Sequence, residues 1–268
     1  MKRKLYISTL AFNSYTIDDI INILVKNKIK FIDLAPLTFF KNWKIFFKKI
    51  KYLKNKLKKN KIEINAIQGI FFQLKIKLFF GSKKDIQKLQ NHLYKIILAS
   101  KELGIKKIII GSSFFRKKKK LSKKLADTKF INFFSRFKNI LKKNKIYFCI
   151  ETIPKQYNED YLYDFNHTLE LVKKINCKYI LINFDTSIYH FKKYNFRLFS
   201  KNFSKIHNTQ VSSKNFKSFI SISKNNRKFS KSLKDFKKLT SISLEMILNK
   251  PNELTIQRSI SNFKKYFS

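Results

Sequence analysis

Apolar residues along the chain gather in eight short runs, and longer segments of mixed polarity separate each run from the next. Runs of this length, rich in Ile, Leu, Phe and Tyr, are typical of buried β-strands. The pattern therefore predicts strands over residues 4–12, 29–35, 61–67, 106–112, 145–151, 177–185, 205–213 and 241–247.

The segments between these runs show the spacing of amphipathic helices. In residues 82–104, apolar side chains recur every three or four positions, Ser82 is placed to cap the first turn, and Gly104 is placed to end the helix. Residues 16–28 and 158–176 repeat this scheme. Helices are predicted least clearly in 186–204 and 214–238.

Eight strands that alternate with helices predict an α/β fold, a closed parallel (β/α)8 TIM barrel, formed by residues 1–268 as a single domain. An open, doubly wound sheet is the alternative. The glycine-rich turn of a dinucleotide-binding fold does not follow the first run. Neither a linker nor an internal repeat interrupts the pattern.

Composition indicates a cytoplasmic protein. Hydrophobic residues make up 44% of the chain, yet no apolar run approaches the roughly 20 residues that cross a bilayer. The N-terminal "MKRKLYISTLAF" has the pattern of a first strand, without the cleavage site of a signal peptide. Cys149 and Cys177 fall in predicted strands and form no C-x-x-C pair, so we expect both to be reduced core thiols.

The net charge of +44 has two interpretations. It is typical of proteins that bind nucleic acids or membrane surfaces. The chain is also rich in Lys, Asn, Ile, Phe and Tyr and poor in Gly and Pro, as an AT-rich genome would produce. Because the lysines are spread along the whole sequence, we favour the second interpretation. The densest run, "RKKKK" at 116–120, is expected in a solvated loop.

Polar residues at the carboxyl ends of the predicted strands are the candidates for chemistry, because a parallel barrel builds its active site at that edge. They are Asp33, Gln68, Ser112, Glu151, Asp185, Gln210 and Glu245. Three carboxylates at the ends of apolar strands are costly to bury without a cation. For any single one of these acids, a salt bridge to a lysine is the simpler explanation. Three at one edge favour a divalent metal, and oxygen ligands suit Mn²⁺ or Mg²⁺.

Six segments, in order, resemble the xylose isomerase-like TIM-barrel superfamily of sugar and sugar-phosphate isomerases and epimerases. They are "IDLAP" (32–36), "AIQGIFF" with "LFFGSKKD" (66–72 and 78–85), "LGIKKIIIGSSFFR" (103–116), "CIETIP" (149–154), "FDTSIYH" (184–190) and "ISLEM" (242–246). The resemblance covers nearly the whole chain and supports the barrel.

The resemblance implies a metal-dependent isomerase or epimerase of carbohydrate metabolism that moves a proton through a metal-stabilised enediolate. Glu151 and Glu245 would be the catalytic acid and base, and Glu151, Asp185, Gln210 and Glu245 would bind the metal. Gln210, in "QVSS", stands where the family usually places a histidine. A glutamine oxygen is a weaker ligand for a transition metal than imidazole.

The substrate would be a small sugar or sugar phosphate. By resemblance His190 would bind a substrate hydroxyl, although a surface histidine is the alternative, and the other histidines are expected to be structural. Gln68 and Ser112, at strand ends, are further substrate-binding candidates. Position and charge suggest Arg116 and Lys155 for a phosphate.

Two other functions stay open at this stage. One is an abasic-site endonuclease of the same superfamily, which four histidines in the chain argue against. The other is a barrel that has lost catalysis and serves as a scaffold. We expect no membrane partner and at most non-specific binding of nucleic acid, and formation of a homo-oligomer is left open.

Overall fold

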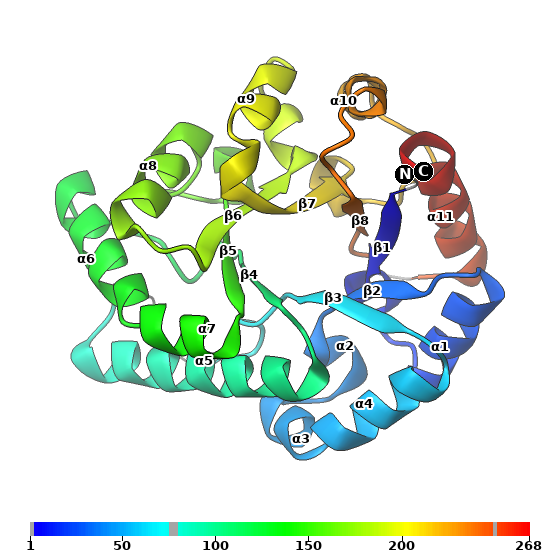
Figure 1. Cartoon of the computed structure of the whole chain (residues 1–268), viewed down its shortest axis with the longest axis horizontal. Helices are drawn as coiled ribbons and strands as arrows, with labels where there is room; N and C mark the ends of the chain where they lie inside the picture. The colour runs from blue at the N-terminus through cyan, green and yellow to red at the C-terminus, as the bar shows by residue number, and fades with distance from the viewer. Residues whose placement is uncertain (1–2, 75–79, 249–250) are drawn as a thin grey trace.

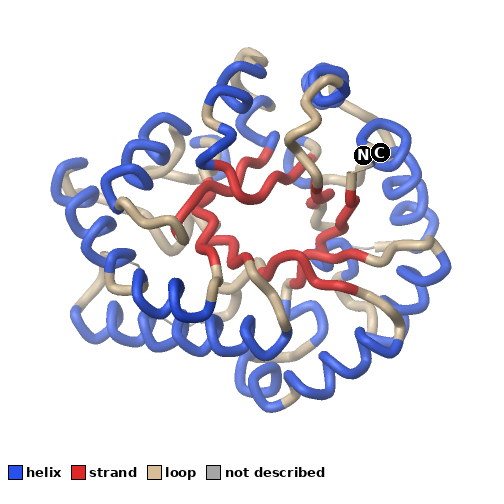
Figure 2. The backbone as a smooth tube through the Cα atoms, in the orientation of Figure 1, coloured by secondary structure: helices blue, strands red, loops and turns tan. Residues whose placement is uncertain are grey.

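The computed structural model describes residues 3–74, 80–248 and 251–268, which form one closed barrel of eight parallel strands in sequential order. The strands form an inner ring with the helices packed outside it (Figures 1 and 2). This arrangement confirms the (β/α)8 barrel and excludes the open sheet, because β1 pairs with β8 over four residues. The first strand also contacts the last helix.

The strands are β1 Lys4–Ser8, β2 Phe31–Leu34, β3 Glu63–Ile67, β4 Lys107–Ile110, β5 Tyr147–Glu151, β6 Ile180–Asp185, β7 Ile206–Ser212 and β8 Ser241–Glu245. Their register aligns Asp185 of β6 with Gln210 of β7, and Ser212 of β7 with Glu245 of β8. The carboxyl ends of the later strands therefore meet at one edge of the barrel.

The helices are α1 Ile17–Lys26, α2 Pro36–Phe39, α3 Trp43–Lys48, α4 Ile50–Lys59, α5 Lys83–Leu103, α6 Lys123–Ser135, α7 Lys138–Asn144, α8 Phe165–Ile175, α9 Phe196–Lys201, α10 Lys224–Lys234 and α11 Glu253–Phe267. The predicted caps are confirmed. Ser82 forms a capping box at the start of α5, and Gly104 ends that helix with a positive φ of 73°. Thr16 forms a capping box at the start of α1.

Several predicted boundaries were wrong. The first strand ends at Ser8, because the next four residues, predicted as strand, turn into a 3-10 helix. Cys177 lies in the turn before β6 and is half-buried, whereas Cys149 is buried within β5, where desolvation raises the pKa of its thiol to about 12. In the weakly predicted 186–204 segment, the α-helix is limited to the six residues of α9.

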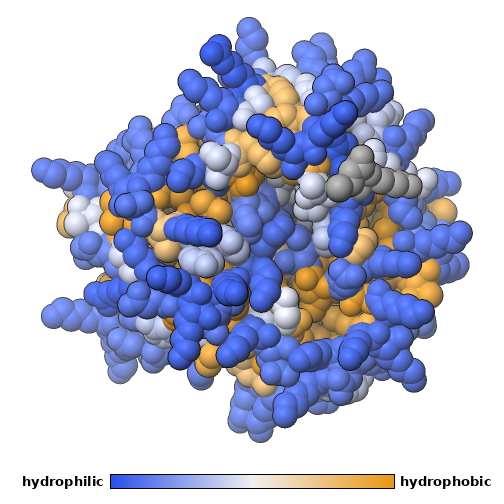
Figure 3. Space-filling model, in the orientation of Figure 1, coloured by the Kyte–Doolittle hydropathy of each residue, from blue (hydrophilic) through white to orange (hydrophobic). Residues whose placement is uncertain are grey.

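Two kinds of interior result from this architecture. Apolar side chains of the helices and the outward faces of the strands form one large hydrophobic cluster, which stabilises the barrel. Inside the barrel, by contrast, buried amides from several strands hydrogen-bond to one another. The outer surface is strongly polar, and Figure 3 shows hydrophilic side chains spread over the whole visible face, with apolar patches between them.

Among the described residues, no helix has both the length and the apolar character needed to cross a bilayer.

Candidate metal centre

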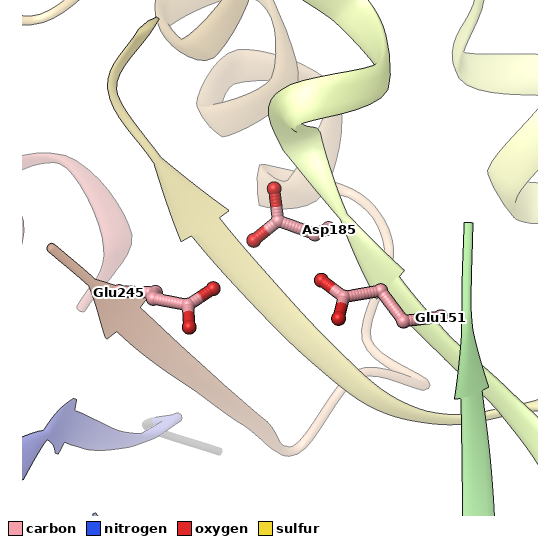
Figure 4. A group of neighbouring side chains, drawn as sticks. All are labelled: Glu151, Asp185 and Glu245. Carbon is pink, nitrogen blue, oxygen red and sulfur yellow. The ribbon is translucent and has the colours of Figure 1, made fainter. Parts of the chain in front are cut away.

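Three carboxylates meet at the carboxyl ends of the strands. Glu151 ends β5, Asp185 ends β6 and Glu245 ends β8, and one oxygen from each lies within 4.8 Å of the others (Figure 4). The parallel register explains why residues almost a hundred positions apart converge here. The sequence predicted that these three acids lie at one edge of the barrel, and the structure places them in one group.

Asp185 is held rigidly by one of its two oxygens. Oδ1 accepts hydrogen bonds from the main-chain N–H of Ser187 at 2.5 Å and from Oγ of Ser212 at 2.7 Å. The other oxygen, Oδ2, is buried and has no hydrogen-bond partner among the described residues. Burial raises the pKa of Asp185, and these hydrogen bonds oppose the shift. A buried carboxylate oxygen without a donor calls for a cation.

Burial raises the pKa of Glu151 to about 8, the nearby charge of Asp185 adds to the shift, and Arg116 opposes it. The carboxylate lies directly over Gly111, where an added Cβ would be 1.6 Å from its Oε2. Glycine at this position therefore makes room for the Glu151 side chain. The sequence analysis missed this role of Gly111.

Glu245 receives a hydrogen bond at Oε1 from the side-chain amide of Gln68, at 3.1 Å. Burial raises the pKa of Glu245 well above its ordinary range, and the charges of Glu151 and Asp185 add to the shift. All three carboxyls are therefore harder to ionise than usual, because each is desolvated and they crowd one another.

The donor set fits a divalent cation. No salt bridge within the described part of the chain involves any of the three carboxylates, and the buried Arg116 pairs with Glu159 at 2.6 Å. The lysine-pairing alternative is thus not supported. Three carboxylates and an unpartnered Oδ2 suit a hard ion such as Mn²⁺ or Mg²⁺, and zinc also accepts carboxylate ligands.

Gln210 lies beside this group and forms two side-chain hydrogen bonds. Its carbonyl oxygen accepts a hydrogen bond from Asn183 at 2.6 Å, and its amide nitrogen donates to Gln68 at 2.8 Å. Gln210 therefore reaches Glu245 through Gln68 in this structure. Its place among the metal ligands stays a prediction.

The orientation of these amides follows from a lysine deeper in the barrel. Lys107 of β4, which can only donate, lies 3.4 Å from the carbonyl oxygen of Asn208. Asn208 in turn donates to Asn183 at 2.9 Å, and Asn183 donates to Gln210. Each amide thus points its N–H toward the carboxylates. We call this series of hydrogen bonds, from Asn208 through Asn183, Gln210 and Gln68 to Glu245, the amide relay.

The predicted substrate-binding residues separate into different places. Gln68 and Ser112 line a pocket of about 580 Å³ together with Glu151 and Glu245. Lys155 is exposed and lines a neighbouring pocket, where its ammonium lies 5.9 Å from the ring of Tyr163.

The other two predicted substrate contacts hydrogen-bond within the protein. Arg116 is buried, and its Nε donates to Glu159 at 2.6 Å. His190 donates from Nε2 to the carbonyl oxygen of Ser212 at 2.9 Å, which leaves Nδ1 as the acceptor of the neutral ring. Burial lowers the pKa of His190, and the charge of Asp185 opposes the shift. The substrate contacts of both residues stay predictions.

Aromatic residues that the sequence analysis did not single out form much of the pocket wall. They are Phe71, Phe72, Phe114, Phe115, Tyr157 and Phe216. They lie in the loops and short 3-10 helices that follow strands β3, β4, β5 and β7. The fragments "GIFF" and "SSFF" contain four of them, but a phenylalanine-rich sequence offers no signal that separates pocket rings from core rings.

Fold and site together define a (β/α)8 barrel with an acidic centre at the carboxyl ends of its strands. A family model described as xylose isomerase-like TIM barrel matches residues 24–266. The chain belongs to this family. No curated protein matches it in sequence.

Solved structures share the fold at low sequence identity. 3-Keto-D-glucoside 4-epimerase YcjR from E. coli is 12% identical with a TM-score of 0.79, covering 98% of this chain and 99% of that one. An AP endonuclease, family 2, from Brucella melitensis is 12% identical with a TM-score of 0.77, covering 99% and 100%. The IolI protein with a bound zinc atom is 13% identical with a TM-score of 0.72, covering 98% and 96%.

Proposed function

We propose that this chain is a divalent-metal-dependent isomerase or epimerase of a sugar. The convergence of Glu151, Asp185 and Glu245 within 4.8 Å, beside a pocket large enough for a small molecule that Glu151 and Glu245 line, carries the proposal. The likeness to an epimerase of a keto-sugar and to a zinc-bound protein supports it. Mn²⁺, Mg²⁺ and Zn²⁺ are the candidate ions.

The reaction would remove a proton from a carbon next to a carbonyl and return it elsewhere. When bound, the cation supplies electrostatic stabilisation of the negative charge that develops on the substrate oxygen. Glu151 and Glu245 line the pocket from separate strands, so one can accept the proton while the other donates one. Asp185, fixed by Ser187 and Ser212, would orient the cation.

An abasic-site endonuclease is the second candidate, because the Brucella protein shares the fold and the chain carries a charge of +44. Such a reaction usually draws on several metal ions with histidine ligands. In the part of the chain that the structure describes, one group of metal-binding type is found, and it contains three carboxylates and no histidine. This composition favours the sugar reaction.

Solvent exchange tests the proposal without knowledge of the sugar. Purified protein with Mn²⁺ is incubated in D₂O with a panel of aldoses, ketoses and their phosphate esters, and mass spectrometry follows the gain of one deuterium. We expect exchange with at least one sugar, and a rate at least ~10²-fold lower in Glu151→Gln and Glu245→Gln.

A matched control keeps this test specific. Glu170→Gln makes the same chemical change at an exposed position on α8 and should leave the rate unchanged. Cleavage of abasic DNA that resists salt, with no exchange into any sugar, would refute the proposal in favour of the endonuclease.

A further inference from the structure

Among the residues that the structure describes, no basic side chain lines the pocket beside the carboxylates. Lys and Arg make up 60 of 268 residues, so a random set of nineteen residues would contain about four of them. Among the nineteen residues that line the pocket in the described part of the chain, none is Lys or Arg. When ionised to bind a cation, Glu151 and Glu245 add negative charge to it.

The two basic residues that the sequence suggested for a phosphate are engaged elsewhere. Arg116 is buried and donates to Glu159. Lys155 lies in the neighbouring pocket against Tyr163. A phosphate dianion in the carboxylate pocket would thus find no basic side chain among the described lining residues, which disfavours its binding.

The walls of the pocket are aromatic. Phe71 stacks on Phe115 with ring centroids 4.5 Å apart, and the edge of Phe114 meets Phe115 at 6.0 Å. Tyr157 contacts Phe216 at 5.1 Å. Ring faces of this kind bind other rings and alkyl groups, whereas sugar hydroxyls need hydrogen-bonding groups.

Apolar side chains at the pocket are also unusually exposed. Phe114 is 63% exposed, Phe72 48% and Ile247 40%, and all three line the pocket. Their exposed surface would be removed from water by an apolar group of a ligand. The volume of about 580 Å³ is in the range that holds drug-sized molecules and therefore has room beyond one monosaccharide ring.

We infer that the substrate is an uncharged sugar that carries an aromatic substituent. The sugar ring would lie at Glu151, Glu245 and Gln68, and the substituent would contact Phe72 and Phe114. This inference rests on the proposed function and narrows its substrate to neutral sugars that keep a carbonyl group, such as keto-glycosides, over sugar phosphates. Simple O-glycosides, which lack that carbonyl, report binding but cannot undergo the reaction. The polar side chains and the exposed rings that line the pocket would then each have a partner.

Matched ligands test the inference. Calorimetry on the Mn²⁺-loaded protein compares a methyl glycoside, the phenyl glycoside of the same hexose and the hexose 6-phosphate. Burying a phenyl group should tighten binding at least ~10-fold over methyl. The phosphate should bind no more tightly than the methyl glycoside.

A substitution at Phe114 tests where in the pocket the phenyl group binds. Phe114→Ala should reduce the preference for phenyl over methyl by at least ~3-fold, because it removes an exposed ring without opening the core. Leu98→Ala, at a residue 56% exposed in another pocket, should keep the preference unchanged.

The outcomes separate the two proposals. The inference would be overturned if the hexose 6-phosphate bound more tightly than the methyl glycoside. It would also be overturned if the phenyl and methyl glycosides bound with equal affinity, or if neither bound. If deuterium exchange occurs only with phosphate esters, the proposed function survives and the inference fails. If the phenyl glycoside binds preferentially and no sugar exchanges, the inference on ligand class survives and the proposed reaction fails.

Discussion

Replacing Glu151 by glutamine should stabilise the metal-free protein, and the gain should grow as the pH rises. Burial and the charge of Asp185 raise the pKa of Glu151 from 4.5 to about 8. The folded protein then holds a proton that the unfolded chain has already released. Between pH 4.5 and 8 the wild type therefore loses stability as the pH rises, because its unfolded state binds fewer protons.

The size of the effect follows from the shift. A carboxyl with a folded pKa of about 8 and an unfolded pKa of 4.5 destabilises the fold by about 3 kcal/mol at pH 7 and by under about 1 kcal/mol at pH 5. Glutamine is uncharged at every pH and has nearly the shape of the protonated acid. Glu151→Gln should therefore approach the wild type at pH 5 and exceed it by up to about 3 kcal/mol at pH 7.

The assay is urea unfolding in EDTA at pH 5, 6, 7 and 8, followed by circular dichroism. Glu170→Gln, which removes the same charge from an exposed position, reports the general effect on a chain of net charge +44. Saturating Mn²⁺ should reverse the order, because the wild type gains free energy from binding the ion. A stability difference that stays constant from pH 5 to 8 would refute the reasoning.

Four further predictions concern the same site. Gly111→Ala should weaken Mn²⁺ binding at least ~10-fold in calorimetry with little change in melting temperature, because the Cβ of the alanine displaces the Glu151 carboxylate. Unchanged affinity would mean that the carboxylate can move aside without loss of the ion. Mn²⁺ affinity should rise with pH up to about 8 and release protons, since the ion replaces the proton on Glu151, and calorimetry in two buffers of different ionisation enthalpy measures this release. Asn183→Leu should weaken Mn²⁺ binding by removing the hydrogen bond that orients Gln210 in the amide relay, whereas Asn262→Leu, on α11, should not. Gln210→His should strengthen Zn²⁺ binding if this position faces the ion, and equal affinity would restrict Gln210 to the relay.

Much of the fold and the acidic centre could be predicted from the sequence. Strands such as Ile180–Asp185 have a local apolar pattern, and their parallel order follows from the helices between them. Once the barrel is assumed, the ends of its strands must meet at one edge. For this reason Glu151, Asp185 and Glu245 could be grouped before any distance was known.

Contacts between side chains far apart in the sequence could not be predicted in this way. The pairing of Arg116 with Glu159 depends on how two loops fold, and it engages a guanidinium that position and charge had suggested for a phosphate. The approach of Glu151 to Gly111 depends on side-chain direction in two adjacent strands. The amide relay likewise requires the register of strands that are distant in sequence.

Crystals grown with Mn²⁺ and measured at the manganese absorption edge test the central claim most directly. We predict one strong anomalous peak at coordination distance from carboxylate oxygens of Glu151, Asp185 and Glu245, and its loss in Glu245→Gln. A peak that lies elsewhere on the chain, or no peak in crystals that hold manganese at saturating concentration, would contradict the account.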